Sequence, residues 1–483
     1  MQYASRTART PLGWKTIARP GDGARTGAVI AGLLLAVLIA PDRADAEETS
    51  KPQPATPELE SVYDPYRGMD KDGRIPEVDK AKYVDHPERW RYIPEGRIKP
   101  GNFFERFLVS SFAVPLFFHN ADVGTGGGLG ITDIDFRQQR RREFLGGFFS
   151  YTTEGQQSYT ARWRRWLKHM DVPGGGVLQE ERSFVSAGGG YRKTLTRRFY
   201  GIGPATNEDD QTSYTDEVGF ADLGLSSSLP GKLDDFVVEL AVRGEGHWLD
   251  HGRVGGHPSM ESPANDPSFP FLFGEAEEVA LGWIGGGLRW DTRDSQRNPY
   301  RGTAIGGAVD AAVVQTDGEV GATYLIFADQ VFPIWPIFHD GGTKDEENPP
   351  TDTLALHFES RLSSGDLPFF ARPTLGGSEI QRGYIEGRWR DDAVWTAAAE
   401  YRFWLLARGF TVWRHIRVER LGAAVFYEVG GVGENGSALF HESLIQSYGV
   451  SARVTVERAA IFRADFGFSG EGFNFSAGFG LSF

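Results

Sequence analysis

The strictest constraint on this chain is the alternation of side chains at its C-terminus. Counting back from the end, every second residue is apolar: these are Phe473, Phe475, Ala477, Phe479, Leu481 and Phe483. The residues between them are Asn, Ser or Gly. A period of two places alternate side chains on opposite faces of a β-strand, so the pattern predicts one strand that runs to Phe483. Segment 462–469 alternates in the same way, and the turn 470–472 between the two predicts an antiparallel hairpin.

The same alternation recurs upstream, with charged residues on the minority face. In segment 354–363, Leu and Phe alternate with His, Glu and Arg, and in segment 238–247, Val and Leu alternate with Glu, Arg and His. A soluble sandwich would expose such charges to bulk water, whereas a transmembrane barrel holds them in its lumen and turns its apolar face to lipid. The many segments of this kind and an aromatic content of 13% favour the barrel.

Sixteen segments have strand character from about residue 103 onward, with fourteen or eighteen strands as the alternatives. They lie near residues 109, 126, 144, 158, 182, 215, 234, 275, 302, 319, 351, 393, 419, 446, 460 and 473. An even number allows both ends of a closed barrel to lie on the periplasmic side. We therefore predict an all-β fold, a transmembrane antiparallel β-barrel of 16 strands over residues 103–483.

The N-terminus carries an export signal. Basic residues precede an uninterrupted small and apolar run over residues 28–40, and Ala44-Asp45-Ala46 offers a cleavage site. We therefore predict a signal peptide over residues 1–46 and a mature chain that begins at Glu47. The run is shorter than the roughly 20 residues that a spanning helix needs, so an uncleaved anchor is the weaker alternative.

The segment after this site is polar and rich in proline. Residues 47–102 show little period of two or of 3.6, and they are too few and too polar for an independent domain. We expect a periplasmic leader with few apolar anchors.

Several classes of function are disfavoured by composition and motifs. The formal charge of −14 argues against a nucleic-acid partner, and the absence of cysteine leaves no disulfide or thiolate metal site. His247, His251 and His257 fit no usual zinc spacing, and solvated histidines explain them. Neither a G-x-S-x-G nor an H-E-x-x-H motif occurs. We expect no enzymatic activity, no catalytic residue, no metal and no cofactor; a lipid-cleaving site with a Ser or Asp and a His at one membrane level remains an open alternative.

Three segments resemble the family of outer-membrane barrels that includes BamA, TamA and the bacterial surface antigens. Segment 374–384, which ends in Gln-Arg-Gly-Tyr, and Glu-Tyr-Arg at 400–402 are similar to the family's long inward-folded loop, with its [VI]-R-G-[FY] motif, and the strand after it. Segment 287–302 resembles the recurrent D-T-R-D…P…G turn, and segment 463–467 resembles the last strands. The resemblance covers the whole predicted barrel but none of the leader.

The loop motif suggests an anchor inside the barrel. The motif and its expected wall partners are Arg382, Gly383, Tyr384, Glu428, Glu400 and Arg402. Arginine keeps its charge in any lumen, and glycine permits the bend that aims it. The resemblance suggests Glu428 as the partner of Arg382, and alternation independently turns Glu428, Glu400 and Arg402 inward. We predict that this pair ties the loop to the wall; the alternative is an exposed Arg-Gly turn beside an ordinary lumenal salt bridge.

The resemblance also implies a role. It suggests a non-enzymatic outer-membrane barrel that acts in insertion or translocation of protein or lipid, with outer-membrane lipid around it and the cell's barrel-assembly machinery as a partner during biogenesis. Phe479, Leu481 and Phe483 would be the assembly signal. Family members that fold other barrels carry periplasmic repeats, for which the leader has no room, so a separate periplasmic partner is expected to replace them. A passive pore or structural barrel plugged by the loop is the alternative function.

Overall fold

The computed structural model describes residues 66–98, 111–120, 122–257, 278–316, 318–343, 345–413, 416–440, 444–456 and 460–483. The predicted signal peptide and the parts of the predicted leader at 47–65 and 99–102 lie outside these residues. Within the described ranges, no helix is long and apolar enough to cross a membrane.

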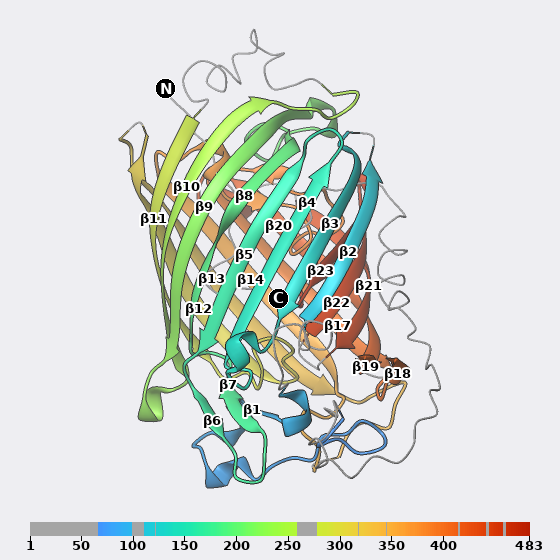
Figure 1. The fold of residues 1–483 in the computed structure, drawn as a ribbon. Helices are drawn as coiled ribbons and strands as arrows, with labels where there is room; N and C mark the ends of the chain where they lie inside the picture. Colours follow the sequence, from blue (N-terminus) through green and yellow to red (C-terminus); the bar gives the residue numbers. More distant parts are fainter. Residues whose placement is uncertain are drawn as a thin grey trace, which may run out of the picture.

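Sixteen strands form one antiparallel sheet in which each strand pairs with the next along the chain. They are β2 (Ser111–Asn120), β3 (Gly124–Asp133), β4 (Glu143–Thr152), β5 (Gln157–Trp166), β8 (Phe184–Phe199), β9 (Thr212–Ser228), β10 (Phe236–His251), β11 (Glu278–Asp291), β12 (Gly302–Gln315), β13 (Gly321–Ile334), β14 (Asp352–Gly365), β17 (Ala393–Leu406), β20 (Arg420–Gly433), β21 (Ile445–Val456), β22 (Ala460–Ser469) and β23 (Gly472–Phe479). The sheet curls round until its first and last strands come to the same side of the molecule (Figure 1). The predicted 16-stranded antiparallel barrel is confirmed.

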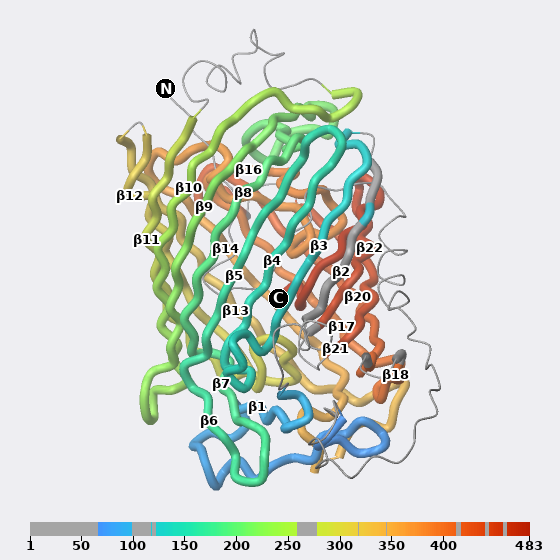
Figure 2. Tube along the Cα trace, viewed as in Figure 1, coloured from blue at the N-terminus to red at the C-terminus, as the bar shows by residue number. Residues whose placement is uncertain are grey.

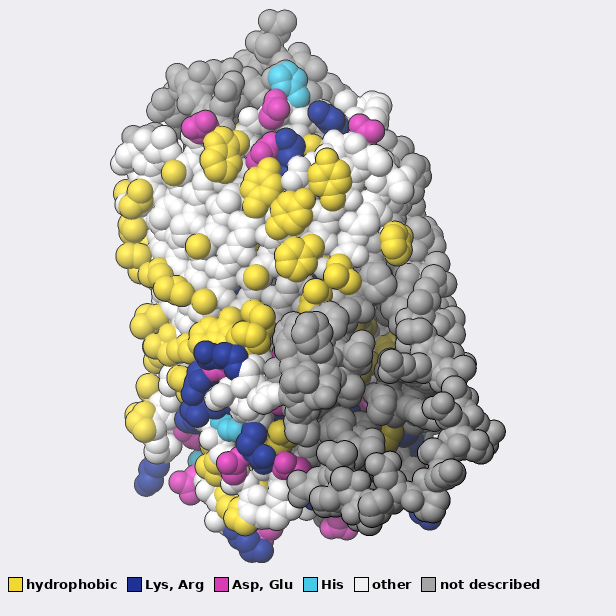
Figure 3. Space-filling view, viewed as in Figure 1, with side chains coloured by type: hydrophobic (Ala, Val, Ile, Leu, Met, Phe, Trp, Pro, Cys, Tyr) yellow, Lys and Arg dark blue, Asp and Glu magenta, His cyan; other side chains and the backbone are white. Residues whose placement is uncertain are grey.

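Alternation sets which side chains face the lumen. Along β20, Ala424, Phe426 and Glu428 are buried, whereas Val425 and Tyr427 between them are about half exposed. Exposed apolar side chains recur on the outward face of other strands, as at Leu240, Ile284, Ile305, Ile326 and Leu356. Figure 3 shows hydrophobic side chains over the wall of the barrel and charged ones gathered towards its two ends. Such an apolar band between polar ends is the surface that a bilayer requires.

The two ends of the barrel differ in what their connections carry. We call the end where β2 begins and β23 ends the base, and the opposite end the top. The base connections that the structure describes lie within residues 134–142, 167–183, 229–235, 292–301, 335–351 and 407–419. They carry η4 (Phe136–Gln138), β6 (His169–Asp171), β7 (Val177–Glu180), η6 (Gly231–Leu233), β18 (Phe410–Trp413) and β19 (Ile416–Val418). The top connections carry η5 (Glu208–Asp210), η7 (Phe369–Ala371), β15 (Thr374–Leu375), β16 (Trp389–Arg390) and η8 (Ala438–Phe440).

The described part of the leader is folded, which differs from the expectation of a segment with few anchors. Residues 66–98 contain η1 (Lys80–Lys82), η2 (Pro87–Arg89), β1 (Trp90–Ile93) and η3 (Glu95–Arg97). β1 pairs with β7, which also pairs with β6, so the leader completes a three-stranded sheet at the base. Ile93, Ile98 and Val177 form a small buried cluster there. These anchors are spaced without a regular period, and the paired residues of β7 lie 84 to 90 positions further along the chain.

The last strand also ends earlier than its alternation predicts. β23 stops at Phe479, Gly480 adopts a positive φ of 84°, and Leu481 and Phe483 are buried instead of facing outward. The ring of Phe483 stacks on His357 with 4.8 Å between ring centroids, and its carbonyl accepts a hydrogen bond from Arg402 at 3.0 Å. A left-handed glycine and these inward partners turn the chain end in towards the lumen.

Candidate functional site: a loop anchored in the barrel

The connection from β14 to β17 is the candidate functional site. It spans residues 366–392, and β15 pairs with β16 to form the neck of a loop over residues 376–388 near the top of the barrel (Figure 2). Gly376 and Gly377 have φ values of 104° and 135°, a region that side chains with a Cβ rarely enter, so the pair makes the bend after β15. Gln381 also has a positive φ, 53°, and is fully buried. This local geometry turns the next residue, Arg382, towards the wall.

Arg382 is held by three carboxylates. Its Nε donates to Glu428 Oε1 at 2.8 Å, and its Nη1 lies 2.8 Å from Glu400 Oε2 and 3.3 Å from Asp465 Oδ1. The backbone N–H of Arg382 donates to the second oxygen of Glu428 at 2.6 Å. Its guanidinium lies over the ring of Phe426, with 3.5 Å from Cζ to the centroid. One side chain from the loop therefore contacts β17, β20 and β22 together.

The site is closed to solvent and rich in charge. Arg382 and Glu400 have no exposed surface, and Glu428 is 1% exposed. Burial opposes the charge on Arg382, but the attraction of Glu428, Glu400 and Asp465 outweighs it and raises the pKa of the guanidinium above its ordinary value. The loop arginine therefore stays charged, and its partners supply the compensation that a buried ion needs.

The three carboxylates are not equivalent. Glu400 also pairs with Arg402, at 2.7 Å, and with Arg453, whereas Asp465 also pairs with Arg463. Among the residues that the structure describes, Arg382 is the cation within reach of Glu428, and the hydroxyl of Ser447 donates to the same carboxylate at 2.8 Å. Glu428 therefore depends on the loop for its counter-charge, and the other two carboxylates do not.

Gly383 allows the loop backbone to lie directly on the wall. A Cβ at this position would come within 2.5 Å of the carbonyl oxygen of Phe468 and 2.8 Å of the Cβ of Ser447. Ser469 and Asn474 donate hydrogen bonds to the carbonyl oxygens of Gly383 and Tyr384, at 3.0 and 2.9 Å. The motif needs glycine here because any side chain would push the loop off β22.

A second arginine anchors the other limb of the loop. Arg388 is 2% exposed, and its Nε lies 2.8 Å from Glu471 in the turn between β22 and β23. Its Nη2 donates to the carbonyl oxygen of Thr206, at 2.9 Å, in the connection from β8 to β9. Tyr384 packs edge-to-face on Trp389 with 4.6 Å between centroids. Arg388 thus joins the loop to two segments that are distant from it in sequence, the β22–β23 turn and the β8–β9 connection.

Comparison with known proteins identifies the part of the chain that carries this loop. Residues 271–483 match the family model described as the Omp85 superfamily domain. This range, which is less than half of the chain, is similar to the domain of that superfamily. The match confirms the resemblance to the BamA-like barrels over that range, which contains all three motifs.

Two solved structures show a distant similarity to this chain. The crystal structure of BamA from Haemophilus ducreyi lacking POTRA domains 1–3 has a TM-score of 0.43 and 11% identity, with 76% of this chain and 69% of that chain covered. CdiB from Acinetobacter baumannii has a TM-score of 0.41 and 10% identity, with 77% and 59% covered. No curated protein matches the sequence.

The structure brings together most of the residues that the sequence singled out. Arg382 meets Glu428 as the alternation and the motif predict, and Glu400 and Arg402 face inward. Gly383 and Tyr384 lie against β22 and β23 of the barrel wall. The single-partner account of Arg382 is incomplete because Glu400 also binds it directly. Asp465 was missed as a partner, although the alternation along 462–469 already turned it inward.

The turn with the D-T-R-D motif forms a separate ionic cluster at the base. Asp291 contacts Arg289 and Arg293 at 3.1 and 3.0 Å, and Arg293 reaches Asp329 at 3.1 Å. Asp294 accepts the backbone N–H of Tyr300 at 3.0 Å and so closes the turn. The motif fixes the base connection between β11 and β12 and lies apart from the loop.

The three neighbouring histidines do not share a site. His247 is buried, not solvated as the sequence reading had it: its Nδ1 lies 2.9 Å from Asp216 and its ring packs on Phe370, whereas His251 is exposed beside Asp250. His257 is exposed in the next connection. The inward face of β10 explains the burial of His247, which the polar context of the sequence obscured.

Proposed function

We propose that this chain is an outer-membrane barrel that acts in the insertion or translocation of protein or lipid, with residues 376–388 as its fixed lumenal loop. The Omp85 superfamily domain supports the class of activity. The observation that carries the proposal is the burial of Arg382 among Glu428, Glu400 and Asp465. Three buried carboxylates that contact one loop residue hold the loop in a fixed position on the inner wall of the barrel.

The alternative function, a passive pore, requires an open lumen. A pore conducts through a polar, water-filled channel. Here the loop is bound at Arg382 to the wall of β17, β20 and β22, and at Arg388 to the turn after β22 and to the connection after β8. The contact with Thr206 joins the loop to a connection far from β20 and β22 in the strand order, which supports a loop that narrows the top of the lumen.

Location and assembly belong to the same proposal. The signal peptide over residues 1–46 would direct the chain to export, and the apolar outer face would place the barrel in outer-membrane lipid. The terminal strand, with Phe479, Leu481 and Phe483, would serve the barrel-assembly machinery, and a separate periplasmic partner would deliver the client. The physical basis for the terminal signal is that an unpaired amphipathic edge joins another sheet by strand addition.

Conductance in planar bilayers tests the choice between the two functions. The intact chain is compared with a variant in which residues 376–390 are replaced by a short Gly-Ser linker. We expect low conductance from the intact chain and a large rise in the variant. Large steady currents from the intact chain would favour the pore. Cross-linking and co-purification from native membranes then identifies the client or partner.

A further inference from the structure

The described leader segment touches most of the base. We refer to residues 66–98 as the cap. Figures 1 and 2 show it lying across the lower end of the barrel, together with β6 and β7. It contacts the base connections at Arg140, at β7, at Asp234 and Asp235, at residues 345–347 and at Glu419. These contacts reach five of the six base connections that the structure describes, so the cap spans the mouth and is not attached at one edge.

The attachments of the cap are chiefly ionic. Lys80 lies 2.7 Å from Glu347, and Arg97 pairs with Glu419. Arg89 contacts Asp234 at 2.6 Å and also pairs with Asp235; Arg91 lies 3.4 Å from Glu181. The cap thus presents cations to an acidic rim. Pairs of this kind set position and register and depend on ionic strength and pH, unlike an apolar seal.

One contact of the cap has the opposite polarity. The Oε2 atom of Glu95, in the cap, lies 3.0 Å from the Nη2 atom of Arg140 and accepts a hydrogen bond from the backbone N–H of Gly176 at 2.8 Å. Burial works against ionisation of Glu95, but these two donors prevail and hold its pKa below the ordinary value. Arg140 has a positive φ of 54°, as do several of its neighbours over residues 137–141. A strained backbone persists where its surroundings fix it, and here it aims Arg140 at the cap.

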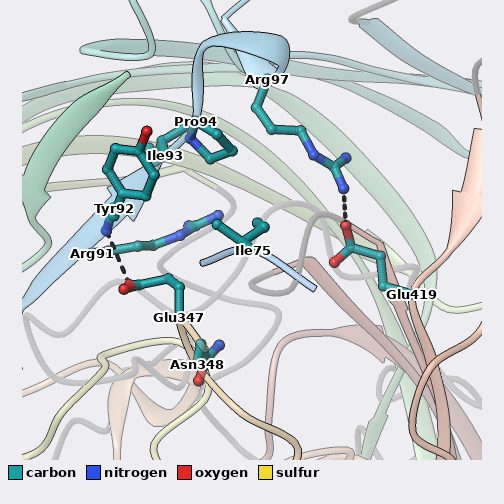
Figure 4. A pocket seen from close by; sticks show the side chains of 9 residues that line it. All are labelled: Ile75, Arg91, Tyr92, Ile93, Pro94, Arg97, Glu347, Asn348 and Glu419. Carbon is teal, nitrogen blue, oxygen red and sulfur yellow. Dashed lines mark hydrogen bonds and ion pairs between the residues drawn. The ribbon is translucent and has the colours of Figure 1, made fainter. Parts of the chain in front are cut away.

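The interface beneath the cap is incompletely packed. A pocket lies between the cap and the base, lined by Ile75, Tyr92, Pro94, Arg97, Glu347 and Glu419 among others (Figure 4). Figure 4 shows Arg97 reaching across to Glu419, and Glu347 reaching the backbone of Tyr92. The apolar contribution is the small cluster of Ile93, Ile98 and Val177, and β1 adds a register of four residue pairs. Elements with few apolar contacts and many polar ones open at low free-energy cost.

We propose that residues 66–98 form a releasable cap that closes the base of the barrel and opens as a unit. Ion pairs and the four-residue register hold it across the mouth, and the pocket beneath it provides the place where separation begins. The proposal does not depend on what the barrel inserts or translocates, so it is tested separately from the proposed function.

A disulfide lock tests the cap directly because the chain contains no cysteine. Arg91 faces Gln179 in the register of β1 with β7, and His169 faces the same Gln179 in the register of β6 with β7. The pair Arg91→Cys with Gln179→Cys joins the cap to the barrel. The pair His169→Cys with Gln179→Cys joins the hairpin to itself and is the matched control. Paired antiparallel positions lie within the distance that a disulfide spans.

Currents are recorded for oxidised and reduced protein, both in the intact chain and with residues 376–390 shortened. In the shortened-loop background we expect at least a several-fold rise in current when the cap lock is reduced, no change in the control pair, and the highest current when residues 66–98 are deleted. Equal currents with and without residues 66–98 would overturn closure by the cap. Equal currents from the oxidised and reduced lock would overturn its release.

Trypsin cleavage within residues 66–98 of the intact chain in nanodiscs gives a second measurement that does not need the shortened loop. We expect oxidation of the cap lock to slow cleavage at least tenfold relative to the reduced form, and oxidation of the control pair to leave the rate unchanged. Equal cleavage rates for the oxidised and reduced cap lock would also overturn release.

Discussion

Replacing Arg382 by alanine isolates the loop anchor from the rest of the barrel. The substitution removes the guanidinium that contacts Glu428, Glu400 and Asp465. The strand ladder does not include this residue, so the barrel itself should keep its heat-modifiable migration on gels. The loop, in contrast, should leave the wall and become accessible to protease.

The size of the effect follows from which carboxylate loses its partner. Glu400 retains Arg402 and Arg453, and Asp465 retains Arg463. Among the described residues, Glu428 loses its cation and keeps hydrogen bonds from two neutral donors, the hydroxyl of Ser447 and the backbone N–H of residue 382. Leaving a buried charge uncompensated costs about 3–5 kcal/mol. Because each 1.4 kcal/mol is a factor of ten, protease access to the loop should rise roughly 100- to 4,000-fold.

A double-mutant cycle supplies the control. Arg382→Ala leaves the charge of Glu428 without a counter-charge, and Glu428→Gln removes that charge. The double variant should therefore expose the loop less than Arg382→Ala alone. Arg388→Ala is the matched comparison: its partner Glu471 is 26% exposed and reaches water, so we expect a cost of about 1 kcal/mol. If the effects of Arg382→Ala and Glu428→Gln add within about 0.5 kcal/mol, the two residues do not act as partners.

Four further predictions concern the loop backbone, the cap and the two termini. Gly383→Ala should undock the loop, because the new Cβ would meet a backbone oxygen of β22 at 2.5 Å; Gly470→Ala, with no atom within 4 Å, should leave loop proteolysis unchanged, and a docked loop in Gly383→Ala would contradict the close contact. The contribution of Glu95 to cap stability is fully present above pH 4.5 and is lost as the pH falls through its lowered pKa. Proteolysis of the cap should therefore rise in acid, and Glu95→Gln should flatten that rise. A pH profile of Glu95→Gln identical to that of the parent would contradict a stabilising contact between Glu95 and Arg140. Deleting Phe483 should lower outer-membrane levels at constant synthesis, and unaltered assembly would remove its role as a signal. The intact mass of the mature protein should correspond to a start at Glu47, whereas a species that keeps residues 28–40 would refute cleavage.

The barrel was predictable because its physics is local. A period of two assigns each residue of a strand to one face, and turn residues mark where each strand ends, so the strands and the inward direction of Glu400 and Glu428 could be predicted from the sequence. The end of β23 could not be predicted in this way. Its alternation continues past Gly480, but the inward turn depends on His357 and Arg402, which lie far away in the sequence.

The site was predictable in part for the same reason. The motif pointed to Arg382, and alternation offered inward carboxylates, but which of them surround the guanidinium depends on where the loop lies against the wall. Asp465 and Glu400 therefore join Glu428 only in three dimensions. The fold of residues 66–98 was harder still to predict from the sequence. Its ion pairs join residues of the leader to base connections up to about 320 positions away, as from Arg97 to Glu419.

The most direct test of the central claim compares the outer membranes of cells that carry the parent chain and the Arg382→Ala variant at equal barrel levels. Quantitative proteomics and lipid analysis of the purified outer membrane report what the barrel inserts or translocates. A role that requires the docked loop predicts that a defined set of outer-membrane proteins or lipids falls in the variant, with recovery when Glu428→Gln is added. An unchanged outer membrane in cells whose variant loop is shown to be undocked by proteolysis would contradict the proposed function.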